Sequence, residues 1–162
     1  MRPFSALTLG FAALASAGSG GYYVANNKAL PNCPPRPASP AEQLAILDDF
    51  VQKFYVEYNF TGSLLEHVPE DYIQHNPHLL SGRQNAIDFF STIVTAETSN
   101  FTIIHKAFED NTAYIHYRSE STGAAEPSAV VDIFRFDGSC MVEHWDVIQE
   151  RPANATNPLA LF

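Results

Sequence analysis

Apolar and polar positions in the first half of the chain follow the period of a helix. Beyond residue 39 the apolar side chains recur at steps of three and four, which is typical of a helix with one buried face. These side chains are Leu44, Leu47, Val51, Phe54 and Tyr58. Ser39 can cap such a helix, Pro40 suits its first position, and Glu42 stands at its third. A long helix is therefore expected from residue 40.

Two shorter helices are expected before residue 100. Residues 63–67 can form a short helix that Pro69 ends. The segment 81–84, Ser-Gly-Arg-Gln, is a second capping pattern, and a third apolar face at helical spacing follows it. The side chains of that face are Ala86, Ile87, Phe89, Phe90 and Ile93.

The second half of the chain has the pattern of β-strands. Segments rich in β-branched and aromatic residues are separated by short turns of polar residues and glycine. The segments are 101–108, 112–121, 128–136 and 141–149. Connections this short give hairpins, so neighbouring strands should be antiparallel. Helices followed by a meander predict one α+β domain, in which the helices cover one face of a curved sheet and enclose a pocket.

The N-terminus has the features of a secretory signal peptide. Met1 and Arg2 give a positive start, residues 4–17 are mostly apolar, and the run ends in Ala-Ser-Ala at 15–17. A membrane anchor is the alternative, but the run is shorter than the roughly 20 residues of a spanning helix. We therefore expect a signal peptide at 1–17, a secreted protein and no membrane attachment after cleavage.

Composition divides the rest of the chain into three parts. Residues 18–39 are rich in glycine and proline and are expected to form a flexible arm. The folded domain is expected at 40–152, and 153–162 form an irregular C-terminal tail. With 162 residues, 46% of them hydrophobic, the chain fits a single globular domain.

Two further features agree with export. Glycosylation sequons begin at Asn59, Asn100 and Asn154. The cysteines, Cys33 and Cys140, form an even pair, and an oxidising compartment would allow them to form a disulfide between the arm and the sheet. Two unpaired thiols remain the alternative, because sequence alone does not show whether the two residues approach each other.

Charge and motifs exclude several function classes. The net charge is −9 and no basic stripe occurs, so nucleic acid and anionic lipid surfaces are poor partners. The chain has no P-loop, no Gly-x-Gly-x-x-Gly and no Gly-x-Ser-x-Gly motif. The spacing of His67, His75, His78 and His116 matches no zinc motif, so no metal is expected.

Asp132 is the most informative polar residue. Strand alternation puts it on the same face as Val130, Phe134 and Phe136, within an apolar segment. A buried carboxylate must be paired, hydrogen-bonded or protonated, and such a group is suited to acid–base chemistry. The alternatives are a solvent-facing aspartate on an edge strand, or a structural ion pair with a nearby arginine, Arg118 or Arg135.

Two histidines could join Asp132. His116 and His144 each stand in the middle of a strand pattern, and on adjacent strands their side chains could converge on the aspartate. A carboxylate beside an imidazole is an acid–base pair. The alternative for each is a core histidine bonded to a backbone carbonyl. His144 and Asp146 share one face of their strand, and Trp145 takes the other.

Several motifs resemble one known family. Residues 72–77, Tyr-Ile-Gln-His-Asn-Pro, with Ser-Gly-Arg at 81–83, resemble a segment of SnoaL-like proteins, which belong to the nuclear-transport-factor-2-like superfamily. Residues 130–138 and 142–147 resemble the C-terminal signature of the same family. The resemblance covers roughly residues 40–152.

The resemblance implies a fold and a set of site residues. The fold is a cystatin-like cone, with three helices against a strongly bent antiparallel or mixed sheet, commonly a homodimer through that sheet. The family's catalytic Asp carries over onto Asp132 and its partner His onto His116. His75 and Trp145 match positions expected to shape the pocket. The full set expected to line it is Tyr72, His75, Asn76, His144, Trp145 and Asp146.

The resemblance also implies an activity. Family enzymes cyclise polyketides by aldol condensation, and relatives isomerise, dehydrate or hydrolyse small hydrophobic substrates without a metal or organic cofactor. The sequence therefore predicts a cofactor-independent acid–base enzyme for a small hydrophobic carbonyl compound. A secreted binding protein with the same pocket is the first alternative. A partner surface with a collapsed, side-chain-filled cavity is the second.

Overall fold

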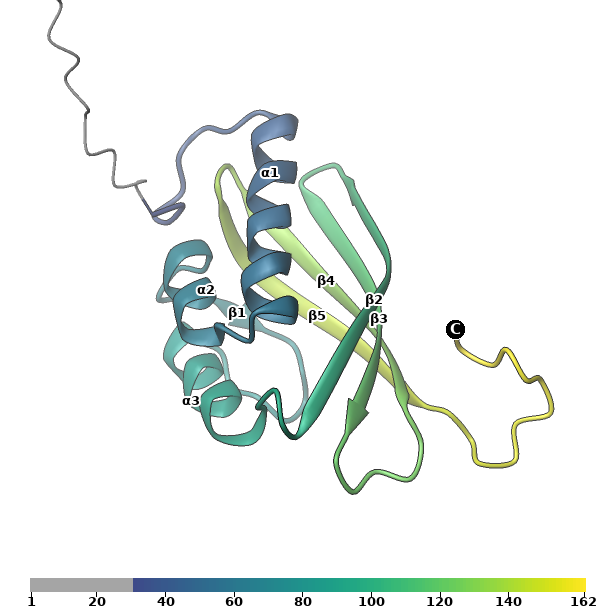
Figure 1. Ribbon diagram of the computed structural model, residues 1–162. Helices are drawn as coiled ribbons and strands as arrows, with labels where there is room; N and C mark the ends of the chain where they lie inside the picture. Colours follow the sequence, from purple (N-terminus) through teal and green to yellow (C-terminus); the bar gives the residue numbers. More distant parts are fainter. Residues whose placement is uncertain (1–30) are drawn as a thin grey trace, which may run out of the picture.

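The computed structural model describes residues 31–162, in which helices pack on one face of a mixed sheet (Figure 1). The expected signal peptide and residues 18–30 of the arm lie outside the described residues. The helical elements are α1 (Pro40–Val51), the π-helical turn η1 (Gln52–Val56), α2 (Phe60–His67) and α3 (Arg83–Ile93). The strands are β1 (Ile73–Gln74), β2 (Ser99–Glu109), β3 (Thr112–Ser121), β4 (Ser128–Asp137) and β5 (Cys140–Glu150).

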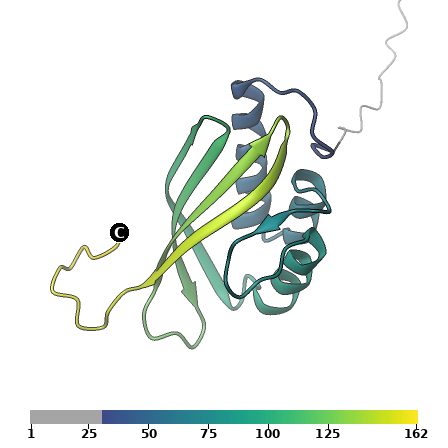
Figure 2. The same cartoon turned by 180° about the vertical axis from the view of Figure 1, so that it is seen from behind.

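The sheet has the order β1-β5-β4-β3-β2. The four long strands form the expected antiparallel meander, and each begins and ends within two residues of its predicted bounds. The short strand β1 had no clear signal in the sequence and pairs parallel to β5. Seen from behind, the opposite face of the sheet carries no helix from residues 31–162 (Figure 2). The α+β prediction is confirmed.

The first helix begins as predicted but buries a different set of side chains. Ser39 Oγ accepts the N–H of Glu42, and the Glu42 carboxylate accepts the N–H of Ser39, so the capping box is present. The described part of α1 buries Gln43, Ile46, Leu47 and Phe50, whereas Leu44 is 42% exposed.

The π-helical turn η1 explains why Tyr55 is buried, although the helical spacing of the sequence did not predict it. The N–H of Glu57 bonds to the carbonyl of Gln52, five residues back, instead of four. The wider turn changes the helical phase, so Phe54 and Tyr55 are both buried. Sequence periodicity assumed 3.6 residues per turn throughout and therefore missed Tyr55.

The other two helices begin differently, because α2 has a side-chain cap and α3 has none. The Asn59 side chain accepts the N–H of Gly62, so α2 begins at Phe60, three residues before the predicted start. The third helix begins after Gly82 without a side-chain cap. The expected capping role of Ser81 is wrong, because its hydroxyl accepts the N–H of Gln74 instead.

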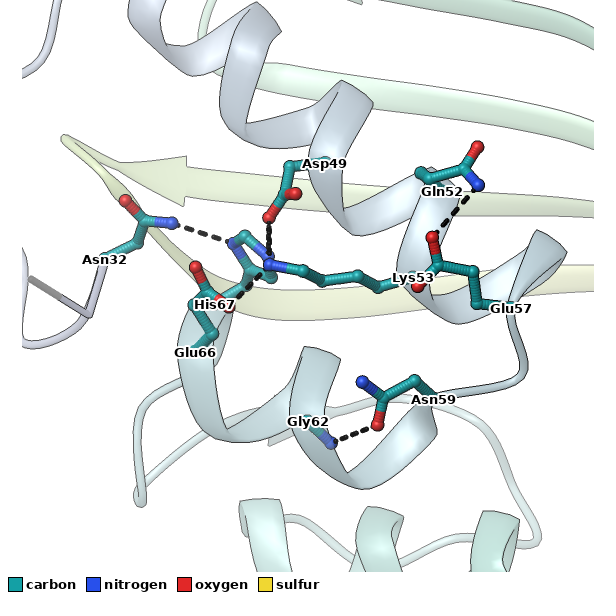
Figure 3. Close-up of polar contacts among 9 residues, drawn as sticks. All are labelled: Asn32, Asp49, Gln52, Lys53, Glu57, Asn59, Gly62, Glu66 and His67. Carbon is teal, nitrogen blue, oxygen red and sulfur yellow. Dashed lines mark hydrogen bonds and ion pairs between the residues drawn. The ribbon is translucent and has the colours of Figure 1, made fainter. Parts of the chain in front are cut away.

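The described end of the arm, residues 31–39, is fastened to the domain rather than free. Cys33 and Cys140 form a disulfide, which confirms the predicted pair. The N–H of Asn32 bonds to the carbonyl of Glu66, and the N–H of Ser139 bonds to the carbonyl of Arg36. The Asn32 side chain also contacts His67 at the end of α2 (Figure 3).

The core is an aromatic cluster between the helices and the inner face of the sheet. Phe50 packs against Phe134 at a ring distance of 5.2 Å, and Tyr55 packs against Tyr117 at 5.1 Å. Within residues 31–162, no helix combines the length and the apolar character needed to cross a membrane. The tail beyond residue 152 has no helix or strand, as expected, and the Arg118 guanidinium lies over the Phe162 ring.

Candidate active site

A cavity of about 230 Å³ lies between the helices and the inner face of the sheet. Apolar and aromatic side chains form most of its wall, and polar groups from β1, the segment after it, β3, β4 and β5 form the rest. The lining residues include Phe54, Tyr55, Tyr72, Phe90, Tyr117, Asp132, His144 and Asp146. Among residues 31–162, the wall contains two carboxylates and no lysine or arginine. The predicted pocket is therefore present, which does not fit the alternative of a collapsed cavity filled by side chains.

Asp132 is buried at the wall of this cavity. It lies on the inner face of the central strand β4, opposite Ile115 of β3 and Asp146 of β5, and is 6% exposed. The Tyr55 hydroxyl donates to its Oδ2, and His144 Nε2 lies 3.2 Å from its Oδ1. The edge-strand alternative is therefore excluded.

The arginine-pair alternative for Asp132 also fails. Arg118 forms its ion pair with Glu120, and Arg135 forms its pair with Glu143. The polar partners of the buried carboxylate are therefore a tyrosine hydroxyl and an imidazole.

Three tyrosines surround Asp132. Burial raises the pKa of the Tyr55, Tyr72 and Tyr117 hydroxyls well above the usual value, and the negative charge of Asp132 raises each pKa further. These hydroxyls are therefore protonated near neutral pH and can donate hydrogen bonds. Sequence analysis identified Tyr72 but missed Tyr55, which η1 turns inward, and Tyr117, which alternates with His116 on β3.

His144 links the carboxylate to the edge of the sheet. It lies on the inner face of β5, is 7% exposed, and packs against the Phe134 ring at 4.6 Å. Its Nδ1 lies 2.8 Å from Oε1 of Gln74 on β1. The parallel pairing of β1 with β5 places Gln74 directly beside His144. Sequence analysis did not single out Gln74, because its role depends on this pairing.

A second carboxylate lies next to the first. Asp146 lines the cavity, and the Asn76 amide donates to its Oδ2 at 2.5 Å. Tyr72, Asn76, His144 and Asp146, all expected to line the pocket, do so.

His116 does not meet Asp132, so the expected convergence of these two residues is wrong. In β3, Ala113, Ile115 and Tyr117 face the core, which leaves His116 on the outer face. Its Nδ1 lies 3.2 Å from Nδ1 of His105, and the two rings are nearly parallel. A β-bulge after Ile103 brings His105 opposite His116. The histidine beside Asp132 is His144.

His75 and Trp145 also lie outside the cavity wall, contrary to expectation. Their rings stack on each other at 4.8 Å, and His75 Nε2 lies 2.8 Å from Glu143 Oε1. The alternation of β5 explains this, because Trp145 stands between two inward residues, His144 and Asp146.

Two groups of described residues have the spacing to contact one metal ion. They are Asp49, Glu66 and His67, and Asp132, His144 and Asp146, with one donor atom of each residue within 4.8 Å of the others. In the first group the Lys53 ammonium contacts both carboxylates at 2.6 Å. In the second, the donors contact each other and Asn76. Because the carboxylates and imidazoles of both groups already contact each other or neighbouring side chains, we assign no metal to either group.

The three predicted glycosylation asparagines are all exposed. Asn59 caps α2 through its Oδ1, and the Asn100 amide donates to Glu120. Asn154 lies in the irregular tail.

Comparison with solved structures identifies the fold. A nuclear-transport-factor-2-like protein of unknown function from Burkholderia xenovorans aligns with a TM-score of 0.60 and 17% identity, over 72% of this chain and 89% of its own. A candidate ketosteroid isomerase from Kribbella flavida aligns with a TM-score of 0.59 and 11% identity, over 75% and 88%. A candidate polyketide cyclase from Acidithiobacillus ferrooxidans aligns with a TM-score of 0.51 and 15% identity, over 67% and 88%. These likenesses establish a cone-shaped α+β fold.

Sequence comparison gives the family. No curated protein is significantly similar to the chain. The profile of the SnoaL-like domain matches residues 48–144, which include the end of α1, the other helices, Asp132 and His144. This match spans more than half of the chain, and the structural neighbours described above have a fold that agrees with it. The protein therefore belongs to the SnoaL-like domain family.

Proposed function

We propose that this protein is a secreted, cofactor-independent acid–base enzyme that acts on a small hydrophobic carbonyl compound. The observation that carries the proposal is the buried Asp132 carboxylate, which lies at the wall of an apolar cavity with an imidazole and a tyrosine hydroxyl as partners. Such a carboxylate can take a proton from a carbon beside a carbonyl group.

The neighbouring groups supply what this step requires. Removing the proton moves negative charge onto the carbonyl oxygen, where a hydrogen-bond donor stabilises it. The protonated hydroxyls of Tyr72 and Tyr117 line the same cavity and can donate there. His144, in place of the expected His116, can return a proton to carbon or oxygen. Aldol-type cyclisation, isomerisation and dehydration all fit this first step.

Cavity size and charge narrow the substrate. A cavity of roughly 150 Å³ is enough to hold benzene, so about 230 Å³ fits one substituted ring or two fused rings. Among the described residues, the wall has two carboxylates and no lysine or arginine, which disfavours a carboxylate or phosphate substrate. A neutral compound with one reactive carbonyl group fits best.

The decisive experiment begins with native mass spectrometry of the protein from its own host and extraction of whatever small molecule co-purifies. That compound is then incubated with wild type, with Asp132→Asn, and with Asp71→Asn as a control on an exposed aspartate. We expect Asp132→Asn to lower kcat by about 10²–10⁴-fold and Asp71→Asn to leave kcat unchanged.

Other outcomes would contradict the proposal. Full turnover by Asp132→Asn would exclude Asp132 as the base. A compound that both proteins bind and neither converts would indicate a secreted binding protein with the same cavity. A protein that carries no small molecule and binds no one- or two-ring carbonyl compound would favour a partner surface.

Secretion and glycosylation belong to the same proposal. The signal-peptide pattern at 1–17, the Cys33–Cys140 disulfide and exposed sequons are consistent with an oxidising extracellular environment. We propose that Asn59, Asn100 and Asn154 carry glycans. Peptide mass spectrometry after enzymatic deglycosylation would identify the occupied asparagines.

We also propose a homodimer through the outer face of the sheet, which no helix of the described part of the chain covers (Figure 2). Tyr114 and Val147 on this face are 43% and 64% exposed. Burying such apolar side chains against a second copy removes them from water.

A further inference from the structure

The Gln74 side chain has a fixed orientation beside the candidate active site. Its Oε1 accepts the backbone N–H of Asn76 at 2.8 Å and lies 2.8 Å from Nδ1 of His144. A backbone N–H only donates, so the amide atom that faces it must be the oxygen rather than the nitrogen. This contact resolves the usual ambiguity between the oxygen and nitrogen of a glutamine side chain.

This orientation determines where His144 carries a hydrogen. An amide oxygen only accepts, so His144 Nδ1 must be the donor. The other ring nitrogen, Nε2, lies 3.2 Å from Asp132 Oδ1. A bare imidazole nitrogen facing a carboxylate oxygen would set two lone pairs against each other. One proton between Nε2 and Oδ1, on either atom, removes that repulsion.

We infer that Gln74 is a positioning residue that holds His144 with a hydrogen on Nδ1, so that Asp132 and His144 keep one exchangeable proton between them. Within residues 31–162, Gln74 and Asp132 are the polar partners of the two ring nitrogens. The ionisable groups around this pair are Asp146, whose Oδ2 accepts from Asn76, and three protonated tyrosines. Tyr55 donates to the other Asp132 oxygen, and Tyr72 and Tyr117 also lie near the carboxylate. Among the described residues, the partners of the His144 ring nitrogens are Gln74 and Asp132 instead.

The consequence for catalysis rests on the proposed function. With the exchangeable proton on Nε2, Asp132 is a carboxylate and can accept the proton of the substrate C–H bond. As an O–H bond forms on Asp132, the electron pair of the C–H bond forms a carbon–carbon double bond, and the π pair of the carbonyl group moves onto its oxygen. The Nε2–H bond then breaks as a new C–H or O–H bond forms on the product. The proton on Asp132 passes to Nε2, and the pair again holds one proton.

The tautomer can be measured without a substrate. Long-range ¹H–¹⁵N correlation spectra of the full secreted protein, with ¹⁵N-labelled histidine, report which ring nitrogens carry hydrogen. The signals of His144 are assigned by their loss in His144→Gln. In wild type we expect Nδ1 of His144 to carry hydrogen at neutral pH. A bare Nδ1 with hydrogen on Nε2 would overturn the inference.

Variants at Gln74 test the cause. Gln74→Glu keeps an acceptor at the same place, and we expect His144 to keep hydrogen on Nδ1. Gln74→Leu removes the acceptor, and we expect the neutral form with hydrogen on Nε2 to become populated. Gln84→Leu, at an exposed glutamine of α3, is the control and should leave the His144 signals unchanged. Unchanged His144 signals in a folded Gln74→Leu protein would overturn the inference. If Gln74→Leu does not fold, the other two spectra still test the inference. Hydrogen on Nδ1 of His144 in both wild type and Gln74→Glu supports it, and a bare Nδ1 in either overturns it.

Activity gives a second readout once a substrate is found. Loss of a residue that orients a functional histidine typically costs about 10- to 100-fold. We expect Gln74→Leu to lower kcat by this factor with KM nearly unchanged, because substrate contacts remain. An effect on KM alone would assign Gln74 to substrate binding and overturn the inference. If Asp132→Asn retains full turnover while Nδ1 carries hydrogen as expected, the proposed function fails and the proton arrangement stands.

Discussion

His67 and Asp132 are both buried ionisable side chains, but their surroundings give them different consequences. Asp132 faces the cavity, whereas His67 is packed between α1, α2 and the N-terminal segment (Figure 3). Its Nδ1 lies 2.9 Å from the Asn32 amide, and its Nε2 lies 2.9 Å from Asp49 Oδ2. Burial lowers the pKa of His67 and outweighs the opposing effect of the nearby carboxylates of Glu66 and Asp49. His67 therefore ties stability to pH.

Replacing His67 should flatten the acid dependence of stability. In the unfolded chain the histidine has its ordinary pKa of 6.5, and in the folded protein the pKa is lower. As pH falls below 6.5 the unfolded state takes up the proton first, so the free energy of unfolding decreases by at most about 1.4 kcal/mol per pH unit. Urea unfolding at several pH values should show a shallower decrease for His67→Gln than for wild type. His78→Gln, at an exposed histidine, should behave as wild type.

Tyr55 should contribute to both stability and activity. Tyr55→Phe removes the hydroxyl that donates to Asp132 and leaves the buried carboxylate with one donor fewer. We expect the free energy of unfolding to fall by about 1–3 kcal/mol and turnover to decrease. Urea unfolding and kcat measurements would check this. Tyr114→Phe, at an exposed hydroxyl on β3, is the matched control, and equal effects of both changes would contradict the assignment.

At the scale of elements, the turn between β4 and β5 organises the N-terminal segment. Gly138 has a φ of 50°, and a Cβ atom there would lie 2.0 Å from the Arg36 carbonyl oxygen. Ser139 donates its N–H to that oxygen, and Cys140 follows with the disulfide. The glycine thus allows the two backbones to approach closely.

A comparison of two glycines separates this contact from backbone strain. Gly123, in the turn between β3 and β4, also has positive φ, 89°, but an added Cβ would meet nothing within 4 Å. Both Gly123→Ala and Gly138→Ala carry a conformational cost of about 1–2 kcal/mol. We expect Gly138→Ala to cost distinctly more, because residues 36–37 must move. Thermal unfolding would measure both, and equal losses would show that the close approach is unimportant.

At the scale of the whole molecule, the two faces of the sheet have different surroundings. The inner face is covered by helices and carries the cavity. The outer face exposes apolar residues, and none of the described helices covers it (Figures 1 and 2). We place the homodimer interface on the outer face for this reason. The wall of the cavity on the inner face is formed by residues of one chain.

A charge on the outer face should therefore dissociate the dimer. Val147→Lys would bury an unpaired ammonium in the proposed interface, which is costly. Analytical ultracentrifugation should show a dimer for wild type and a monomer for this variant. Val56→Lys, at a valine of similar exposure on η1, is the control and should remain dimeric. A monomeric wild type would refute the interface.

The sequence by itself determined the parts of this protein that depend on local patterning. Helix caps, turn residues and the alternation of β4 act over a few residues, so they predicted the helices, the four long strands and the inward direction of Asp132. The partners of Asp132 were not determined locally. The strand with His116 has aromatic or aliphatic residues in both alternating sets, and only packing decided that Ile115 faces inward.

Tertiary structure also decided which tyrosine and which amide complete the site. Tyr55 turns inward through a π-helical turn, and Gln74 meets His144 through a parallel pair of strands that lie 70 residues apart in the sequence. Both depend on contacts between distant segments, which periodicity does not encode. The sequence therefore specified the three α-helices, the four long strands and which carboxylate is buried. Only the folded chain determined which imidazole, hydroxyl and amide surround that carboxylate.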